Sequence, residues 1–501
     1  MYLKDHHKVW LATGEKAVYL EPSMANRHGI IAGATGTGKT VTLKVLAESF
    51  SDMGVPVFLC DIKGDLTGMC NPGKETKHIR RSIDNMGLDS AGYDYTAYPV
   101  RFFDVYGKNG HPVRTTVTDM GPELLARLLD LNDTQSGVLR IVFRIADDEQ
   151  LLLSDLKDLR AMVQYVGDNA KEYKLTYGNV SAQTVGAIQR ALLALEDEGG
   201  NVFFGEPELD LRDWVEWDEN GRGVMNILEC QELFQHPLLY GTFLLWMLSE
   251  IYEMFPEVGD LEKPKLAFFF DEAHLLFDDA PKALIETVER MVRLIRSKGV
   301  SVWFITQNPS DVPDSVLGQI GNRIQHGLRA YTPADQKALR AAANSFRANP
   351  NFDTEEALVS LGTGEALVSV LDEKGVPTIV EKANILPPSS SMDAASEEDV
   401  KAAIKASPLF GKYEEVKDEK SAYEIITEQQ EEQAKEEKKA AEKEEKEKAK
   451  KEKEKSKKKT SKATKKATSA FNKTVNSAAN TIGREVGKKI VRGIFDTFFK
   501  G

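Results

Sequence analysis

Cysteine is almost missing from this chain of 501 residues, which has only Cys60, Cys70 and Cys230. Three scattered thiols cannot build a disulfide framework or a cysteine-based zinc site, which indicates a reducing compartment. The sequence also lacks a run approaching 18 apolar residues, so we expect no membrane-spanning helix. Residues 1–16 contain no apolar segment typical of a secretory signal. These absences predict a cytoplasmic protein.

Positive charge is scarce in most of the chain. The formal net charge is −13, but residues 412–501 hold 25 Lys+Arg against 18 Asp+Glu, so residues 1–411 carry −20. An acidic body argues against a protein that coats nucleic acid with its whole outer surface. It does not exclude a basic channel, because phosphates respond to the local charge.

The strongest positive signal is GATGTGKT at residues 33–40, which matches G-x-x-x-x-G-K-[ST]. An apolar run precedes it and a helical apolar pattern follows, which predicts a strand, a glycine-rich loop and a helix. Backbone N–H groups in such a loop, together with the helix N-terminus, bind phosphate. An ordinary glycine turn is the alternative. We predict that a nucleotide is bound by Gly33, Ala34, Thr35, Gly36, Thr37, Gly38, Lys39, Thr40 and Val41. Lys39 would contact the β- and γ-phosphates, and the Thr40 hydroxyl would bind Mg²⁺.

Strand and helix patterns alternate over most of the chain, which predicts an α/β fold with a mostly parallel sheet covered on both faces. Residues 121–200 instead show helical periodicity, and we interpret them as a helical insertion between strands of the sheet. We expect this domain to comprise residues 1–390.

The segment LAFFFDEAH, residues 266–274, narrows the chemistry. Its buried strand would deliver Asp271 and Glu272 to the edge where ligands bind in open α/β sheets. Asp271 can hold Mg²⁺ through water, and Glu272 can deprotonate the water that attacks the γ-phosphate. The alternative is that Asp271 only caps a helix. The adjacent acids favour hydrolysis over transfer to a hydroxyl group.

Several further polar residues are candidates for the same site. Gln307 ends the next predicted strand, where a neutral amide could sense the γ-phosphate. Arg323, Arg329 and Arg27 are candidates for an arginine that a neighbouring subunit delivers to the γ-phosphate. Each could instead be a strand-end or surface residue without such a role. A guanine-reading N-K-x-D motif is not found in a suitable place, which favours ATP.

The C-terminal region has a different composition. Residues 391–468 are rich in lysine and glutamate, which predicts a charged linker that is helical or disordered. Residues 469–501 recover an apolar stripe beside Arg484, Lys488 and Arg492, which predicts an amphipathic helix. That helix could dock on the protein itself, on a partner protein or on a membrane surface. We expect the body to fold without residues 412–501.

Five segments in order resemble the HerA/FtsK-type ATPases, and most of all the HerA-like bacterial ATPases: GIIAGATGTGKT, VFLCDIKGDLTGM, LAFFFDEAH, RSKGVSVWFITQNP and LGQIGNRIQHGLRAYTPADQKALRAAA. The resemblance covers roughly residues 10–390. It implies a RecA-like P-loop core and a hexameric ring that hydrolyses ATP, with Mg²⁺, to move along duplex DNA. It also implies the residue roles: Walker A Lys39 and Thr40, Walker B Asp271 and Glu272, sensor Gln307, interface Arg323, and Asp61 and Lys63 beside the nucleotide.

The sequence departs from that family in two places. Only about 27 residues precede the P-loop strand, so we expect no N-terminal β-barrel of the kind HerA proteins carry. The charged tail also lies outside the resemblance. Two other functions stay open: a ring ATPase that transports or remodels protein, as in secretion or conjugation systems, and a regulator that uses nucleotide as a switch.

Overall fold

The computed structural model describes residues 1–259, 261–277, 282–418 and 420–463. Their strands form one sheet in the order β1-β2-β13-β12-β11-β4-β10-β9-β5-β8-β6-β7, with β3 beside β2. The strands are β1 (Tyr2–Leu3), β2 (Lys8–Thr13), β3 (Ala17–Leu20), β4 (Gly29–Ala32), β5 (Val57–Asp61), β6 (Val100–Asp104), β7 (His111–Pro112), β8 (Met225–Glu229), β9 (Leu266–Phe270), β10 (Val300–Thr306), β11 (Asn322–His326), β12 (Glu365–Ser369) and β13 (Glu381–Ile385).

The helices are α1 (Lys39–Asp52), α2 (Lys77–Met86), α3 (Val117–Leu128), α4 (Asp133–Asp148), α5 (Leu156–Asp168), α6 (Ala170–Tyr173), α7 (Ala182–Asp197), α8 (Gly200–Phe203), α9 (Pro237–Met254), α10 (Lys282–Leu294), α11 (Asp314–Leu317), α12 (Pro333–Asn344), α13 (Thr354–Ser360), α14 (Glu397–Ala406) and α15 (Ala422–Ala463). Helices α3 to α8 occupy the chain between β7 and β8, which includes the segment that the sequence predicts as a helical insertion.

The strands from β11 to β7 run parallel to their neighbours. The strands at the other end, β12, β13, β2, β1 and β3, pair antiparallel. The segment before the P-loop strand thus adds three strands to the antiparallel end of the sheet. The predicted α/β fold with a mostly parallel sheet is confirmed.

Both faces of the sheet are buried, because successive side chains of a strand point to opposite faces. Phe268 and Phe270 of β9 pack in one core with α9, α10 and the helices between β7 and β8. Phe269 lies between them in sequence and packs in the other core, with α1 and α2. Burial on both faces explains why β9 reads as an unbroken apolar run.

The register of the parallel strands brings four strand ends to one edge. Ala32 of β4 pairs with Thr306 of β10, and Phe270 of β9 pairs with Phe304 of β10 and with Cys60 of β5. The segments that leave β4, β10, β9 and β5 therefore emerge side by side. These are the segments in which the sequence places its candidate site residues.

The compact body of the chain extends to Thr427, beyond the predicted boundary at residue 390. We call residues 407–427 the C-terminal strap. Tyr413, Ala422 and Ile426 of the strap are buried, at 1%, 0% and 3% exposure. The sequence assigned these residues to a charged linker because their neighbours are mostly Lys and Glu. The strap buries a few isolated apolar residues that lie among these charged neighbours.

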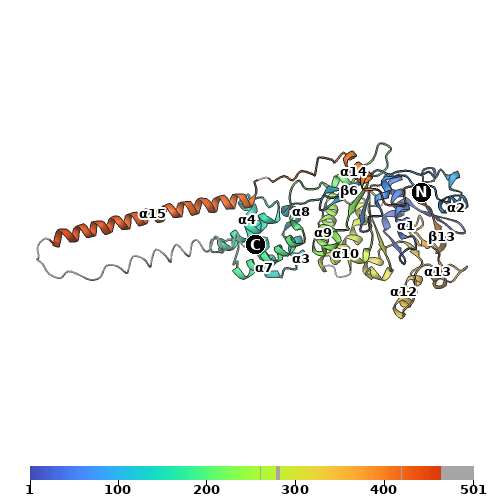
Figure 1. Cartoon of the computed structure of the whole chain (residues 1–501). Coiled ribbons are helices and arrows are strands. Elements are labelled where there is room, and N and C mark those ends of the chain that lie inside the picture. Colours follow the sequence, from blue (N-terminus) through green and yellow to red (C-terminus); the bar gives the residue numbers. More distant parts are fainter. Residues whose placement is uncertain (260, 278–281, 419, 464–501) are drawn as a thin grey trace. The chain divides into compact units, whose positions relative to one another are not determined.

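A second unit begins at Glu428 and contains most of α15, which Figure 1 draws as one uninterrupted helix. The structure therefore has a helix over much of the segment predicted to be helical or disordered. The amphipathic helix predicted over 469–501 lies outside the described residues. In the part of the chain that is described, no helix is long and apolar enough to cross a bilayer.

Candidate functional site

Three glycines of the phosphate loop have backbone angles that other residues rarely adopt. Gly33, Gly36 and Gly38 have φ angles of 155°, 76° and 113°. At Gly33 there is also no space, since a Cβ there would lie 2.5 Å from the Cβ of His326. The glycine spacing of the motif therefore follows from the backbone path of the loop.

Backbone hydrogen bonds attach the loop to the neighbouring strands. The N–H of Gly33 donates to the Thr306 carbonyl at 3.2 Å, and the N–H of Ala34 donates to the Gly327 carbonyl at 2.9 Å. Helix α1 starts directly after the loop, and its N-cap residue Gly38 supplies no side-chain hydrogen bond. The side chain of the N-cap residue therefore does not occupy the positive end of α1, as an anion site requires.

Lys39 is the buried cation of the loop, with 7% of its surface exposed. Its ammonium group donates to the carbonyl oxygens of Gly33 at 2.6 Å and Ala34 at 3.2 Å. Burial lowers the pKa of Lys39, and the charge of Glu272 acts in the opposite direction. The other predicted loop residues are exposed at Thr35 and Gly36, and half-buried at Ala34, Thr37, Gly38, Thr40 and Val41.

The fully buried His326, which the sequence analysis did not single out, lies beside the phosphate loop. Nδ1 of His326 lies 2.9 Å from the Glu365 carbonyl, and Nε2 lies 2.8 Å from the Thr42 hydroxyl on α1. Because a carbonyl only accepts, Nδ1 carries the proton and Nε2 accepts from Thr42. Burial lowers the pKa of His326 to about 4, so the ring is neutral at pH 7. A polar residue ending a buried strand beside β4 is the signal that could have identified it.

The acidic pair that follows β9 is buried and lies among polar side chains from two other strand ends. The ammonium group of Lys63 forms an ion pair with Oε1 of Glu272, and Nε2 of Gln307 donates to Oε2 at 3.4 Å. The N–H of Glu272 donates to Oδ1 of Asp271 at 2.9 Å. Glu272 has a φ angle of 48°, which is uncommon outside glycine. The structure thus brings together the predicted Asp271, Glu272 and Gln307.

The charges of this cluster stabilise one another. Burial alone would raise the pKa of Glu272, but the hydrogen bond and the charge of Lys63, together with the hydrogen bond from Gln307, outweigh burial and lower that pKa. Burial would likewise lower the pKa of Lys63, yet its carboxylate neighbours raise it. Burial raises the pKa of Asp271 to about 6, while Lys63 acts against that rise. Glu272 is therefore held ionised, as a proton acceptor must be.

Lys63 reaches Glu272 because a tight turn after β5 directs it there. The buried carboxylate of Asp61 accepts hydrogen bonds from the N–H groups of Gly64 at 2.7 Å and Leu66 at 3.0 Å. Burial raises the pKa of Asp61 to about 7, and the neighbouring Asp65 adds to that rise. The sequence pointed to Asp61 and Lys63 only through the family resemblance.

The three candidate arginines lie apart from this cluster. Arg323 is in the first half of β11, and its guanidinium donates to the Leu317 carbonyl at 3.1 Å. Burial lowers the pKa of Arg323. Arg27 precedes β4, at the end of the strand opposite the phosphate loop. Arg329 is exposed, two positions after Gly327, the residue that binds the loop.

The metal-binding residues predicted from the sequence, Thr40 and Asp271, come from the first turn of α1 and the end of β9. Among the described residues, no group of three or more His, Cys, Asp or Glu side chains is arranged to hold a metal ion. Thr40 and Asp271 are oxygen ligands of the kind that bind Mg²⁺ together with phosphate oxygens. The residues therefore fit a metal that arrives with a nucleotide rather than a dedicated protein cage.

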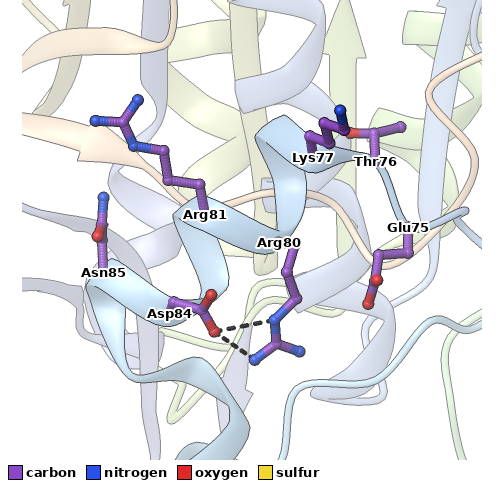
Figure 2. A pocket seen from close by; sticks show the side chains of 7 residues that line it. All are labelled: Glu75, Thr76, Lys77, Arg80, Arg81, Asp84 and Asn85. Carbon is purple, nitrogen blue, oxygen red and sulfur yellow. Dashed lines mark hydrogen bonds and ion pairs between the residues drawn. The ribbon is translucent and has the colours of Figure 1, made fainter.

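A surface hollow of about 480 Å³ on α2 is unrelated to this site. Its lining residues all come from one segment, as Figure 2 shows: Glu75, Thr76, Lys77, Arg80, Arg81, Asp84 and Asn85. Within it, Arg80 pairs with Asp84 and also contacts Asp89. The hollow contains no residue of the phosphate loop or of the acidic pair.

Comparison with known proteins identifies relatives among helicases. The chain is 30% identical over 373 residues to the probable helicase MJECL08 of Methanocaldococcus jannaschii, covering 69% of this chain and 64% of that protein. It is 21% identical to the DNA double-strand break repair helicase HerA of Sulfolobus acidocaldarius, covering 71% and 64%. The chain thus spans 64% of the length of these curated relatives.

Solved structures of the plasmid coupling protein TrwB share the fold. The complex of TrwB with ADP and Mg²⁺ superposes with a TM-score of 0.51 at 15% identity, covering 77% of this chain and 92% of TrwB. The complex with the non-hydrolysable GTP analogue GDPNP also gives 0.51, at 14% identity, covering 78% and 94%. At this identity the likeness shows the fold alone. The family description that matches the chain, over residues 7–501, is "Helicase HerA-like C-terminal". This chain therefore belongs to the HerA-like helicase C-terminal family.

Proposed function

We propose that this chain hydrolyses ATP and, assembled into a hexameric ring, uses the energy to move along duplex DNA. The observation that carries the ATPase part is the position of Glu272, ionised by Lys63 and bonded to Gln307, at the sheet edge that also holds Lys39. A water attacking the γ-phosphorus would give its proton to Glu272 as the bond to the β–γ bridging oxygen breaks and ADP leaves.

The other residues of the site bind the substrate. Lys39 would turn from the loop carbonyls to the β- and γ-phosphates, and the N–H groups of the glycine loop would contact the same oxygens. Mg²⁺, which neutralises phosphate charge when bound, would be held by Thr40 and Asp271. Gln307 would orient the water, because its amide bonds to the same carboxylate.

Duplex DNA as the track is supported by the relatives, whose names describe a probable helicase and a DNA repair helicase. ATP turnover should be measured with and without linear duplex DNA, on assembled rings and on dissociated subunits. We expect duplex DNA to accelerate the rings and not the isolated subunits. Acceleration by an unfolded protein but not by DNA would replace this proposal with a ring ATPase that transports or remodels protein.

Ring assembly would matter for catalysis if an arginine acts across a subunit boundary. We assign this role to Arg323, with the exposed Arg329 as the alternative. Mixing an Arg323→Ala chain with a Glu272→Gln chain should restore some interfaces with both groups intact. The Arg323→Ala and Glu272→Gln mixture is compared with a mixture of Arg329→Ala and Glu272→Gln, under conditions in which subunits exchange. If only the second mixture gains activity, the role belongs to Arg329.

We also propose that the protein works in the cytoplasm. Its three cysteines, Cys60, Cys70 and Cys230, are free thiols, and two of them are buried. Free thiols are stable in a reducing compartment. Immunolocalisation of the full chain tests this assignment directly.

A further inference from the structure

A module of two helices is inserted between β11 and β12, and both of its ends are bonded to the phosphate loop. We call residues 328–363, which contain α12 and α13, the α12–α13 module. Directly before the module, the Gly327 carbonyl accepts from the Ala34 N–H at 2.9 Å. Directly after it, the Gly364 N–H donates to the Thr37 carbonyl at 3.0 Å. A shift of the phosphate loop therefore acts on the module from both ends.

The module has a small hydrophobic core of its own. Its members come from α12, α13 and β12 and include Leu339, Ala342, Ala343, Leu358 and Leu367. Figure 1 shows the two helices side by side at one margin of the body. Close-packed side chains resist deformation, so a shift at either end of the module carries α12 with it.

The part of the module that contains α12 is basic, although the body as a whole is acidic. Residues 328–348 hold four Lys or Arg and one acid, Asp335, which caps the start of α12, so they carry a net charge of +3. The other three acids of the module lie within residues 353–356, at the start of α13. Lys337 and Arg340 are both exposed, and neither side chain forms an ion pair or a hydrogen bond with any residue that the structure describes. Both charges are thus available to an external anion.

The exposed cations share one face of α12. At 100° per residue, Lys337 and Arg340 lie about 60° apart around the helix, and the amide of Asn344 lies between them. We call Lys337, Arg340 and Asn344 the α12 basic face. The buried Leu339 and Ala342 lie on the opposite side of the helix. Around the basic face, α12 has no exposed aromatic residue and no exposed aliphatic residue larger than proline. The face therefore lacks the apolar centre that a subunit interface or a membrane-bound helix needs.

We propose that the α12 basic face binds the phosphate backbone of duplex DNA and that the nucleotide in the phosphate loop sets its position. This rests on the proposed function that duplex DNA is the track of the motor. Cationic and amide side chains are the groups that contact phosphates in protein–DNA complexes. Lys337 and Arg340 are separated by a rise of about 4.5 Å, and B-DNA carries one phosphate per about 1.7 Å of its axis, so each cation can reach a phosphate of its own.

The connection to the loop gives this contact a role in movement. A motor needs a DNA contact that differs between its nucleotide states, since a contact of constant strength cannot release and rebind the track. The α12–α13 module meets this need, because the two residues that flank it are bonded to Ala34 and Thr37 of the loop.

The test compares two full-length variants with equal charge loss. In one, Lys337 and Arg340 become glutamine. In the control, Lys77 and Arg81 become glutamine, which again removes one lysine and one arginine from the exposed surface of a helix. Arg329 is left in place because it is a candidate for the arginine that acts in trans. The affinity for a fluorescent duplex of mixed sequence is measured across a range of salt concentrations, with ADP and with a non-hydrolysable ATP analogue. Light scattering gives the oligomer size of each variant.

We expect the α12 variant to lose about two units from the slope of log affinity against log salt in one nucleotide state, since each phosphate contact contributes about 0.9. The loss should be clearly smaller in the other state, and the control should lose less than about half a unit in both. Equal losses in the two variants, no loss in either, or the same loss in both nucleotide states would overturn the proposal. A smaller oligomer with unchanged DNA affinity would assign the face to a subunit contact instead.

The same measurements separate this proposal from the proposed function. A parent chain that does not bind duplex DNA would refute the motor, and the α12 contact with it. An α12 variant with an unchanged slope, whose ATP turnover duplex DNA still accelerates, would refute only the α12 contact.

Discussion

The phosphate loop and the C-terminal strap are both bonded to segments far away in sequence, as the bonds of Gly33 to Thr306 and of Ala34 to Gly327 show for the loop, but the loop also forms a recognisable local motif. Within the loop, Lys39 bonds to Gly33 six positions away, and Thr37 bonds to Ala34 three positions away. The strap is bonded to the body by contacts that span 199 to 303 positions, including Lys412 with Asp213 and His111 with Glu414. The residue types and spacing of the loop motif predict its structure. The strap has no such motif, so the sequence shows only that its composition is mostly charged.

The largest expected effect separates the strap from the charged helix. A chain ending at residue 427 keeps every strap contact, whereas a chain ending at residue 408 loses the buried Tyr413, Ala422 and Ile426. Burial of a large apolar side chain is worth about 1.5–3 kcal/mol, so we expect the shorter chain to lose about 5 kcal/mol of stability. Thermal unfolding of both chains measures this. Equal stability would show that the strap contacts do not stabilise the body.

The next effect concerns the loop itself. Lys39→Ala removes the buried cation from the glycine cradle, so nucleotide affinity should fall about 10- to 100-fold, as for a charge-assisted hydrogen bond. Titration with a fluorescent ATP analogue measures the affinity. Lys44→Ala is a poor control because Lys44 is also buried, so the exposed Lys77→Ala is used instead. Unchanged affinity in Lys39→Ala would contradict the assignment of this loop to phosphate.

A smaller effect is expected at Lys63. Lys63→Met leaves Glu272 without its cation, so its carboxylate loses both orientation and charge stabilisation. We expect kcat to fall about tenfold with little change in KM, because substrate binding depends on the loop. Lys63→Arg should retain most of the activity. A loss that appears only in KM would mean that Lys63 binds nucleotide instead of positioning Glu272.

Within the strap, a single contact should matter less than the whole. The Tyr413 hydroxyl donates to the Asp213 carboxylate and accepts from the Asp210 N–H at 3.2 Å. Tyr413→Phe removes both bonds and keeps the packed ring, so we expect a loss of about 1–2 kcal/mol in the free energy of unfolding. Denaturant unfolding of the variant measures it. A variant as stable as the parent would show that packing alone holds the strap.

The smallest effect is a pH dependence that originates at His326. Its pKa is about 4 in the folded protein and about 6.5 when unfolded, so the unfolded chain takes up protons first as the pH falls. Stability should fall as the pH decreases from about 6.5 toward 4, by about 0.5–1 kcal/mol between pH 7 and pH 6. Unfolding of His326→Gln should depend less on pH than that of the control His78→Gln, whose ring is exposed. Identical pH profiles would contradict this account.

Much of the fold follows from sequence patterns. Alternating strands and helices predict the parallel sheet, and the apolar run from Leu266 to Phe270 predicts a strand buried on both faces, because periodicity reports which faces are covered. Strand ends in a parallel sheet share an edge, so the meeting of the phosphate loop with Glu272 and Gln307 is also predictable. Neither inference needs information about distant contacts.

The remaining features depend on three-dimensional packing that spacing does not encode. The sequence could not show that Arg323 is half-buried and bonded to Leu317, since an arginine on a strand reads as exposed. It could not show that His326 lies under Gly33, because that contact joins different strands. The strap boundary at Thr427 was missed for the same reason, since its partners lie far away in sequence.

The central claim is that Glu272 is the proton acceptor of an ATP hydrolysis site. The most direct measurement is the turnover of Glu272→Gln beside its affinity for ATP, in the full-length chain with duplex DNA present. The account predicts that ATP binds with near-parental affinity, because the loop with Lys39 is untouched, while turnover falls about 10²-fold or more. Hydrolysis at the parental rate would contradict it.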